Sequence, residues 1–183
     1  MSGTNVFASH KQARLRGILA GVRTHDCVFI SHKREDAAMA RAVADALTDF
    51  DIDVWLDLDE LGFPEPSTTE EHLRLTLAIE AGMNASSHLL ALITRNTKGS
   101  WWVPFEIGSC RAKRKPLAFL LHKEVREIPS YFAVGTGLQN KHDFYDWAKA
   151  LSSRKVEVDR RAVLATLSVS PLDQYIELIL ERR

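Results

Sequence analysis

Residues 26–36, DCVFISHKRED, decide the fold class of this chain. They begin with CVFIS (27–31), a short continuous apolar run of the kind found in strands that are buried on both faces. A polar elbow follows, and a helix is then predicted over about residues 35–49, with an apolar face formed by Met39, Val43, Leu47 and Phe50. A buried strand that passes directly into an amphipathic helix is typical of an α/β fold with a parallel sheet.

The alternation of strand and helix continues along the chain. Further buried strands are predicted at residues 52–58 (IDVWLDL), 88–94 (HLLALIT) and 116–122 (PLAFLLH). Helices are predicted over residues 101–115 and 143–151, and Pro104 is compatible with the first of them because it lies in the first turn. The sequence therefore predicts a flavodoxin-like, doubly wound parallel sheet with helices on both faces.

One more helix is predicted between the second and third strands. Thr68 stands three residues before Glu71, which is the spacing of a capping box at a helix start. Gly82 is predicted to end this helix. Its apolar face is predicted to consist of Leu73, Leu77 and Ala81.

Ligands of open α/β sheets bind at the carboxyl ends of the strands, where the connecting loops gather. In this chain the rule selects four segments, namely Ser31–Arg34, Asp57–Pro66, Thr94–Trp102 and His122–Glu124. The chemistry of the protein is expected in these loops.

The two ends of the chain are predicted to lie outside the domain of residues 24–151. Residues 1–23 hold basic side chains and no acid, and they are predicted to form an amphipathic helix or arm with the apolar stripe Leu15, Ile18, Leu19 and Val22. An organellar transit peptide has a similar composition. Residues 152–183 are predicted to be a helical extension, whose last helix opens at Ser170 and Pro171.

The composition argues against several classes of protein. The chain has 24 basic and 24 acidic residues, and this balance argues against nucleic-acid binding as its main task. No apolar run approaches the roughly 18 residues of a membrane-spanning helix. Cys27 and Cys110 are too few for a disulfide framework or a structural zinc site. We therefore expect no metal, no membrane contact, and reduced thiols in the cytoplasm.

His32, Lys33 and Arg34 form a basic cluster where the first strand ends and the next helix begins. Basic side chains and a helix N-terminus both favour a phosphate or pyrophosphate group. The alternative is a solvated surface loop, and the cluster by itself does not decide between the two interpretations.

Trp102 and Glu106 are four residues apart, so they share one face of the predicted helix. A carboxylate beside an aromatic ring suits a nucleoside, because the carboxylate binds ribose hydroxyls while the ring stacks on a base. Glu106 also lies about one turn inside the helix N-terminus, where the dipole favours its ionised form. The alternative, which spacing alone favours, is a core tryptophan followed by an exposed acid.

Three segments, in their order and spacing, resemble the TIR domain family: FISHKRED (29–36), VWLDLDE (54–60) and SWWVPFEIGSC (100–110). The similarity is strongest to enzymatic TIR domains of bacterial immune systems, of the Thoeris anti-phage type, whose hallmark is Trp-x-x-x-Glu. Here that motif is Trp102 and Glu106, and the resemblance covers about residues 24–151. It departs from the family in the usually glycine-rich turn after the second strand, which here reads GFPEP (62–66).

The resemblance implies that Glu106 is the glutamate required for NAD⁺ cleavage, with NAD⁺ as the substrate and no separate cofactor. It implies that Trp102 lies beside Glu106 and that residues of the first two loops bind the substrate, namely Ser31, His32, Lys33 and Asp57. It also implies self-association through TIR surfaces, a cytoplasmic location, and a nucleotide product that activates a separate effector protein in anti-phage immunity.

One carboxylate is sufficient for this chemistry. Ordinary glycosidases use two carboxyl groups, one of which protonates a poor leaving group. Nicotinamide in NAD⁺ is already cationic at its ring nitrogen and leaves as a neutral molecule, so no general acid is needed. What remains is to stabilise the oxocarbenium-like transition state. The sequence leaves open whether water, adenine, ribose or an external nucleophile captures the cation.

Three alternative functions compete with the NAD⁺-cleaving enzyme. A TIR domain that acts only as an interaction module shares the fold, and the presence of both Trp102 and Glu106 favours the enzyme. A phosphoacceptor receiver domain would use Asp57 and Lys123, but it also needs a carboxylate pair after the first strand, where this chain has SHKR (31–34). A serine hydrolase is disfavoured because no G-x-S-x-G elbow follows a strand.

Overall fold

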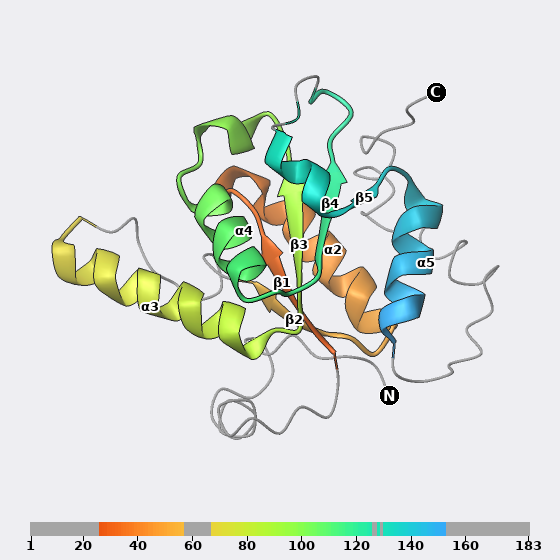
Figure 1. Ribbon diagram of the computed structural model, residues 1–183, viewed down its shortest axis with the longest axis horizontal. Helices are drawn as coiled ribbons and strands as arrows, with labels where there is room; N and C mark the ends of the chain where they lie inside the picture. Colours follow the sequence, from red (N-terminus) through yellow and green to blue (C-terminus); the bar gives the residue numbers. More distant parts are fainter. Residues whose placement is uncertain (1–25, 57–66, 126–127, 129, 153–183) are drawn as a thin grey trace.

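The computed structural model describes residues 26–56, 67–125, 128 and 130–152. Within these residues five strands form one sheet in the order β2-β1-β3-β4-β5, and all neighbouring strands are parallel (Figure 1). The strands are β1 (Cys27–Ser31), β2 (Asp53–Leu56), β3 (His88–Ile93), β4 (Leu117–Leu121) and β5 (Thr136–Leu138). The predicted doubly wound parallel sheet is confirmed.

Four α-helices of the described residues cover the sheet. They are α2 (Ala37–Asp49), α3 (Thr69–Ala85), α4 (Trp102–Ala112) and α5 (Lys141–Leu151). Short 3-10 helices lie in the connections, namely η1 (Arg34–Asp36), η2 (Asn96–Gly99) and η3 (Ser130–Val134). The predicted helices over about 35–49 and 143–151 are confirmed to within two residues.

The sheet separates two apolar cores, as expected when both faces are covered. Side chains of β1 alternate between them. Val28 and Ile30 pack with α2 and α5, whereas Cys27 and Phe29 pack with α3 and α4. Figure 1 shows the corresponding layers, with α3 and α4 on one side of the sheet and α2 and α5 on the other. This alternation determines the face of the sheet on which the residue at the end of each strand lies, and therefore the helices that it contacts.

The predicted apolar face of α3 is wrong. Leu73 and Leu77 are 57% and 55% exposed, and the buried residues of the helix are instead Leu75, Ile79, Gly82 and Met83. Both sets repeat at helical spacing, so the pattern does not choose between them. The structure shows the reason: the amino-terminal half of α3 extends away from the sheet (Figure 1), and only the second set reaches the core.

Gly82 does not end α3, which continues to Ala85. A Cβ atom at Gly82 would lie only 2.1 Å from Nε1 of Trp55, whose indole is buried between β2 and this helix. Glycine is therefore required here for close packing of the helix against Trp55, and it does not mark a helix C-terminus.

Two further features differ from the sequence-based prediction. The fifth strand, β5, was not predicted, since its three residues are too few to show a pattern. The helix predicted over 101–115 ends at Ala112, because Arg114 adopts a left-handed conformation with φ 55°. Lys115 instead extends to the end of α3, where its Nζ donates to the carbonyl oxygens of Met83, Asn84 and Ser86.

The predicted capping box of α3 is confirmed, and it gives the helix start a pH dependence. Glu71 Oε2 accepts from the backbone N–H groups of Ser67 (2.8 Å) and Thr68 (3.0 Å) and from the Ser67 hydroxyl (3.0 Å). The backbone N–H of Ser67, followed by its hydroxyl, lowers the pKa of Glu71 from 4.5 to about 2. Because this pKa is depressed in the folded state, the stabilisation is present above pH 4.5 and is lost as the pH falls towards 2.

We therefore expect hydrogen-exchange protection factors of the first turn of α3 to fall between about pH 4.5 and pH 2 when NMR measures them. The control is Glu71→Gln, whose first turn should show little change over the same range. Equal protection of the native first turn at both pH values would contradict this prediction.

Several predicted segments lie outside the described residues. They are the N-terminal helix or arm (1–23), the loop after β2 that includes Asp57, and the C-terminal extension beyond Ser152. Among the described helices, none is both long and apolar enough to cross a membrane.

Candidate functional site

A buried hydrogen bond joins Ser31, the last residue of β1, to Glu106 in α4. The Ser31 hydroxyl donates to Glu106 Oε2, and both residues have no exposed surface. Ser31 follows the strand alternation that places Cys27 and Phe29 on the α3–α4 side, so its side chain faces α4. The interpretation of Glu106 as an exposed helix acid is therefore wrong.

The local sequence places Glu106 under α4 for a simple reason. Val103, Glu106, Ile107 and Cys110 recur at helical spacing and form the buried side of the helix. The helix begins at Trp102, and the hydroxyl of Ser100 accepts from the N–H of Val103 at 3.2 Å. Glu106 is thus an acid in an otherwise apolar stripe, about one turn inside the helix N-terminus, where the dipole favours an anion.

Trp102 lies at the margin of this site. It is half-buried, packs against the α3–α4 core, and meets the ring of Phe105 edge-on with 5.8 Å between ring centroids. Its neighbour Trp101 is 91% exposed. Of the two adjacent tryptophans, Trp102 therefore belongs partly to the core, whereas Trp101 is available at the surface.

The residues of the predicted basic cluster lie in different environments in the structure. His32 is buried, and its Nδ1 lies 3.3 Å from the carbonyl oxygen of Ile30. Lys33 is partly exposed and pairs with Glu35 at 3.1 Å. The Lys33 ammonium also lies 3.6 Å from the position that a Cβ on Gly99 would occupy, which places it beside η2, just before α4. The ammonium is thus close to the start of the helix that carries Glu106.

Cys110 lies one turn after Glu106 and is also buried. Burial raises the pKa of the Cys110 thiol to about 11, while the charge of Lys115 opposes that rise and the charge of Glu106 adds to it. The thiol is therefore protonated near neutral pH and is a poor nucleophile. Cys27 and Cys110 are both free, as the sequence predicted.

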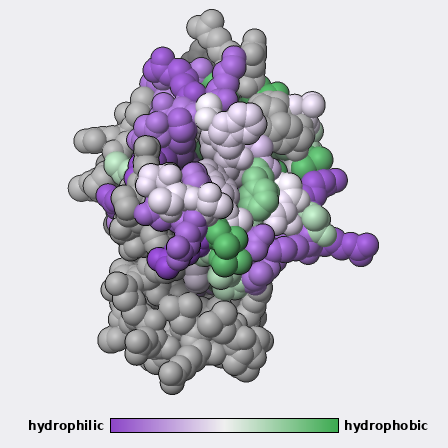
Figure 2. All heavy atoms as spheres, turned by 90° about the vertical axis from the view of Figure 1, so that its left-hand side faces the viewer, coloured by the Kyte–Doolittle hydropathy of each residue, from purple (hydrophilic) through white to green (hydrophobic). Residues whose placement is uncertain are grey.

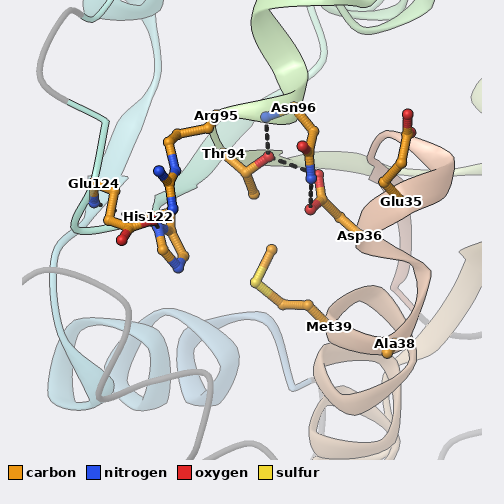
Figure 3. Close-up of a pocket in the computed structure, with 9 residues that line it drawn as sticks. All are labelled: Glu35, Asp36, Ala38, Met39, Thr94, Arg95, Asn96, His122 and Glu124. Carbon is orange, nitrogen blue, oxygen red and sulfur yellow. Dashed lines mark hydrogen bonds and ion pairs between the residues drawn. The ribbon is translucent and has the colours of Figure 1, made fainter.

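A surface pocket of about 370 Å³ lies at the same edge of the sheet but on the other face (Figure 3). Ile93 and Leu121 belong to the α3–α4 core, so the residues that follow them, Thr94 and His122, face the α2 side. The first turn of α2 supplies the opposite wall, including Met39. The loops after β3 and β4 were predicted from the sequence to hold the chemistry, but no local pattern indicates that they meet the start of α2.

Exposed apolar side chains lie on the side formed by α3 and α4. They include Leu73 and Leu77 of α3, Trp101, and Phe105 of α4. Figure 2 shows this side, where apolar side chains stand in small groups among hydrophilic ones. In the described part of the chain, no group of three or more His, Cys, Asp or Glu side chains is arranged to hold a metal ion.

Comparison with known proteins identifies a family and also finds solved structures of similar fold. The family model described as TIR domain matches residues 28–160, which is well over half of the chain. No curated protein matches the sequence. A solved structure of a 2-deoxyribosyltransferase from the psychrotolerant bacterium Bacillus psychrosaccharolyticus has a TM-score of 0.50 and 12% identity, covering 75% of this chain and 95% of that chain. At this identity the similarity supports the fold alone.

Proposed function

This chain belongs to the TIR domain family, and from that premise we propose that it is an enzyme that cleaves the bond between nicotinamide and ribose in NAD⁺. The observation that carries the proposal is the buried Glu106, which accepts a hydrogen bond from Ser31 at the carboxyl end of β1. Ligands of open α/β sheets bind at this edge. A stripe residue that served packing alone would be apolar, because a buried carboxylate is costly without compensation.

The chemistry follows from the substrate's own charge. The bond between ribose C1′ and the nicotinamide nitrogen breaks, and its electron pair neutralises the pyridinium. As the bond breaks, the carboxylate of Glu106 stabilises the positive charge that develops on the ribose. Capture by water yields ADP-ribose and releases a proton, whereas capture by the substrate's adenine or ribose yields a cyclic isomer.

The other proposed substrate contacts bind the remaining parts of NAD⁺. Lys33, close to the start of α4, suits the pyrophosphate, and Trp102 suits stacking at the margin of the site. His32, Asp57 and Ser31 complete the proposed binding set, and Ser31 contributes through its hydrogen bond to Glu106. Since Glu106 is fully buried in this state, contact with the ribose requires neighbouring groups to move aside. A dependence of activity on self-association fits this requirement.

We further propose that the product is an ADP-ribose-derived signal, cyclic or conjugated, which activates a separate effector protein in the cytoplasm during anti-phage defence. The support is the resemblance to signal-producing bacterial TIR proteins. Incubating the purified protein with NAD⁺ and identifying the products by mass spectrometry tests both the cleavage of NAD⁺ and the identity of the product. Nicotinamide release supports the cleavage, and a product other than ADP-ribose supports the signal.

Ser31→Ala is expected to lower kcat for nicotinamide release by about 10- to 100-fold, with KM changed by less than about threefold. The reason is that the Ser31 hydroxyl holds the Glu106 carboxylate in place. Ser86→Ala is the matched control, because Ser86 is a buried serine like Ser31. Its hydroxyl donates to the backbone carbonyl oxygen of Gly82 at 2.9 Å and not to a carboxylate. A large rise in KM with kcat unchanged would instead make Ser31 a substrate contact.

The alternative function is a non-catalytic interaction module. The observation that favours it is the presence of three large exposed apolar side chains, Trp101, Leu73 and Leu77. The same assay separates the two functions. A folded protein that releases no nicotinamide at any concentration, alone or crowded, is an interaction module.

A further inference from the structure

The pocket on the α2 side of the sheet contains a carboxylate that is held in a fixed position. Thr94 Oγ1 donates to Asp36 Oδ2 at 2.7 Å, and Asn96 Nδ2 donates to Asp36 Oδ1 at 2.7 Å (Figure 3). These bonds join the start of α2 to the segment after β3. Among the described residues, no basic side chain forms an ion pair with Asp36.

The other charges around the pocket are already compensated. Glu35 pairs with Lys33 at 3.1 Å, and Arg95 pairs with Glu124. Among the lining residues that the structure describes, the remaining charge is therefore the negative charge of Asp36. Because both of its oxygens are oriented by neutral donors, the carboxylate is preorganised to meet a cation without rearrangement.

His122 lies opposite Asp36 and lines the pocket with its imidazole ring. Burial lowers the pKa of His122 from 6.5, although the charge of Glu124 opposes this effect, so the ring is neutral near pH 7.5. Its Nδ1 accepts from the backbone N–H of Glu124 at 3.4 Å. The other ring nitrogen, Nε2, points into the open space in Figure 3.

The floor of the pocket is apolar. Met39 is buried, and its flexible thioether lies between Asp36 and His122 in Figure 3. Methionine sulfur packs favourably against flat rings. The volume of about 370 Å³ falls within the roughly 300–1,000 Å³ of small-molecule sites. An anionic end, a neutral imidazole opposite it and an apolar floor together define one kind of ligand.

We propose that this pocket is a second ligand site, separate from Glu106, which binds a small organic cation with its charged N–H group against Asp36 and its apolar body over Met39. The site and Glu106 lie on opposite faces of the sheet, so one ligand at the pocket leaves Ser31 and Glu106 untouched. Asn96 also begins η2, and the occupied site therefore adjoins the turn that leads into α4.

Three probes of matched shape test the proposal with the full chain at pH 7.5: benzamidine, which is cationic, benzamide, which is neutral, and benzoate, which is anionic. Titration followed by ¹H–¹⁵N NMR is expected to show benzamidine shifting the amide signals of residues 94–96 and 122–124. Its affinity is expected to exceed that of benzamide by at least about tenfold and to fall with added salt. Benzoate is expected not to bind.

Two variants separate the role of Asp36 from a general effect of charge. Asp36→Asn keeps the size of the side chain and is expected to remove the preference for benzamidine over benzamide. Asp45→Asn makes the same charge change at an exposed position of α2 outside the pocket, and it is expected to retain that preference. Glu106→Gln is expected to bind benzamidine as the native protein does.

The wild-type titration alone can overturn the proposal. Unmoved signals at residues 94–96 and 122–124, or equal binding of benzamidine and benzamide, would show that the pocket holds no cation site. Loss of benzamidine binding in Glu106→Gln would place the probe at the other face. None of these outcomes bears on NAD⁺ cleavage, so the two proposals fail independently.

Discussion

Glu106→Gln is expected to lower the rate of nicotinamide release from NAD⁺ by at least about 1,000-fold, while the protein stays folded. Glutamine has nearly the shape of glutamate and still accepts the hydrogen bond from Ser31. What it lacks is the negative charge beside the developing cation. In a site with no exposed surface that charge is poorly screened, and the expected loss corresponds to about 4 kcal/mol of transition-state stabilisation.

The measurement is nicotinamide release over a range of protein concentrations, since activity is expected to rise with self-association. Glu70→Gln is the matched control, because it makes the same change at an exposed position of α3 and removes only a surface ion pair with Arg74. Turnover of Glu106→Gln close to that of the native protein would show that Glu106 is not the essential carboxylate. Absence of turnover in the native protein would reject the enzymatic function itself.

Gly82→Ala is expected to destabilise the fold by about 3 kcal/mol. In an exposed helix this substitution stabilises by about 1 kcal/mol, because alanine has the higher helix propensity. Here the added methyl group would lie 2.1 Å from Nε1 and 2.4 Å from Cε2 of Trp55, so either the indole or the helix must move. Chemical denaturation measures the change in free energy of unfolding.

Gly108→Ala supplies the comparison within the same protein. Gly108 also lies inside a helix, α4, but a Cβ there would meet no atom within 4 Å. It is expected to stabilise the fold by about 0.5–1 kcal/mol. Opposite signs for the two substitutions support close packing at Trp55, and two stabilising substitutions would contradict it.

Local sequence predicted the elements that form by local rules. The buried strands at 27–31 and 88–94 were recognisable because both faces of a central parallel strand are apolar, which leaves a continuous run. The capping box of Thr68 and Glu71 was recognisable because its hydrogen bonds span only three residues.

Predictions failed where two local patterns were equally good. In α3 the residues Leu73 and Leu77 repeat as regularly as Leu75 and Ile79, and only the position of the sheet decides which pair is buried. The burial of Glu106 had a usable local signal, because Val103, Ile107 and Cys110 form an apolar stripe on the same face of the helix.

The sequence by itself determined the α/β class and the order of the predicted strands and helices, because periodicity is a property of neighbouring residues. It made Glu106 the leading candidate for chemistry only through the resemblance of three segments to the TIR family. Only the tertiary structure brings Ser31 into hydrogen-bond contact with Glu106, which lies 75 positions later in the sequence. Only the tertiary structure packs the indole of Trp55 against Gly82. It also decided that Asp36 and His122 share a pocket. Such contacts depend on how the sheet brings distant segments together, and no local pattern encodes that arrangement.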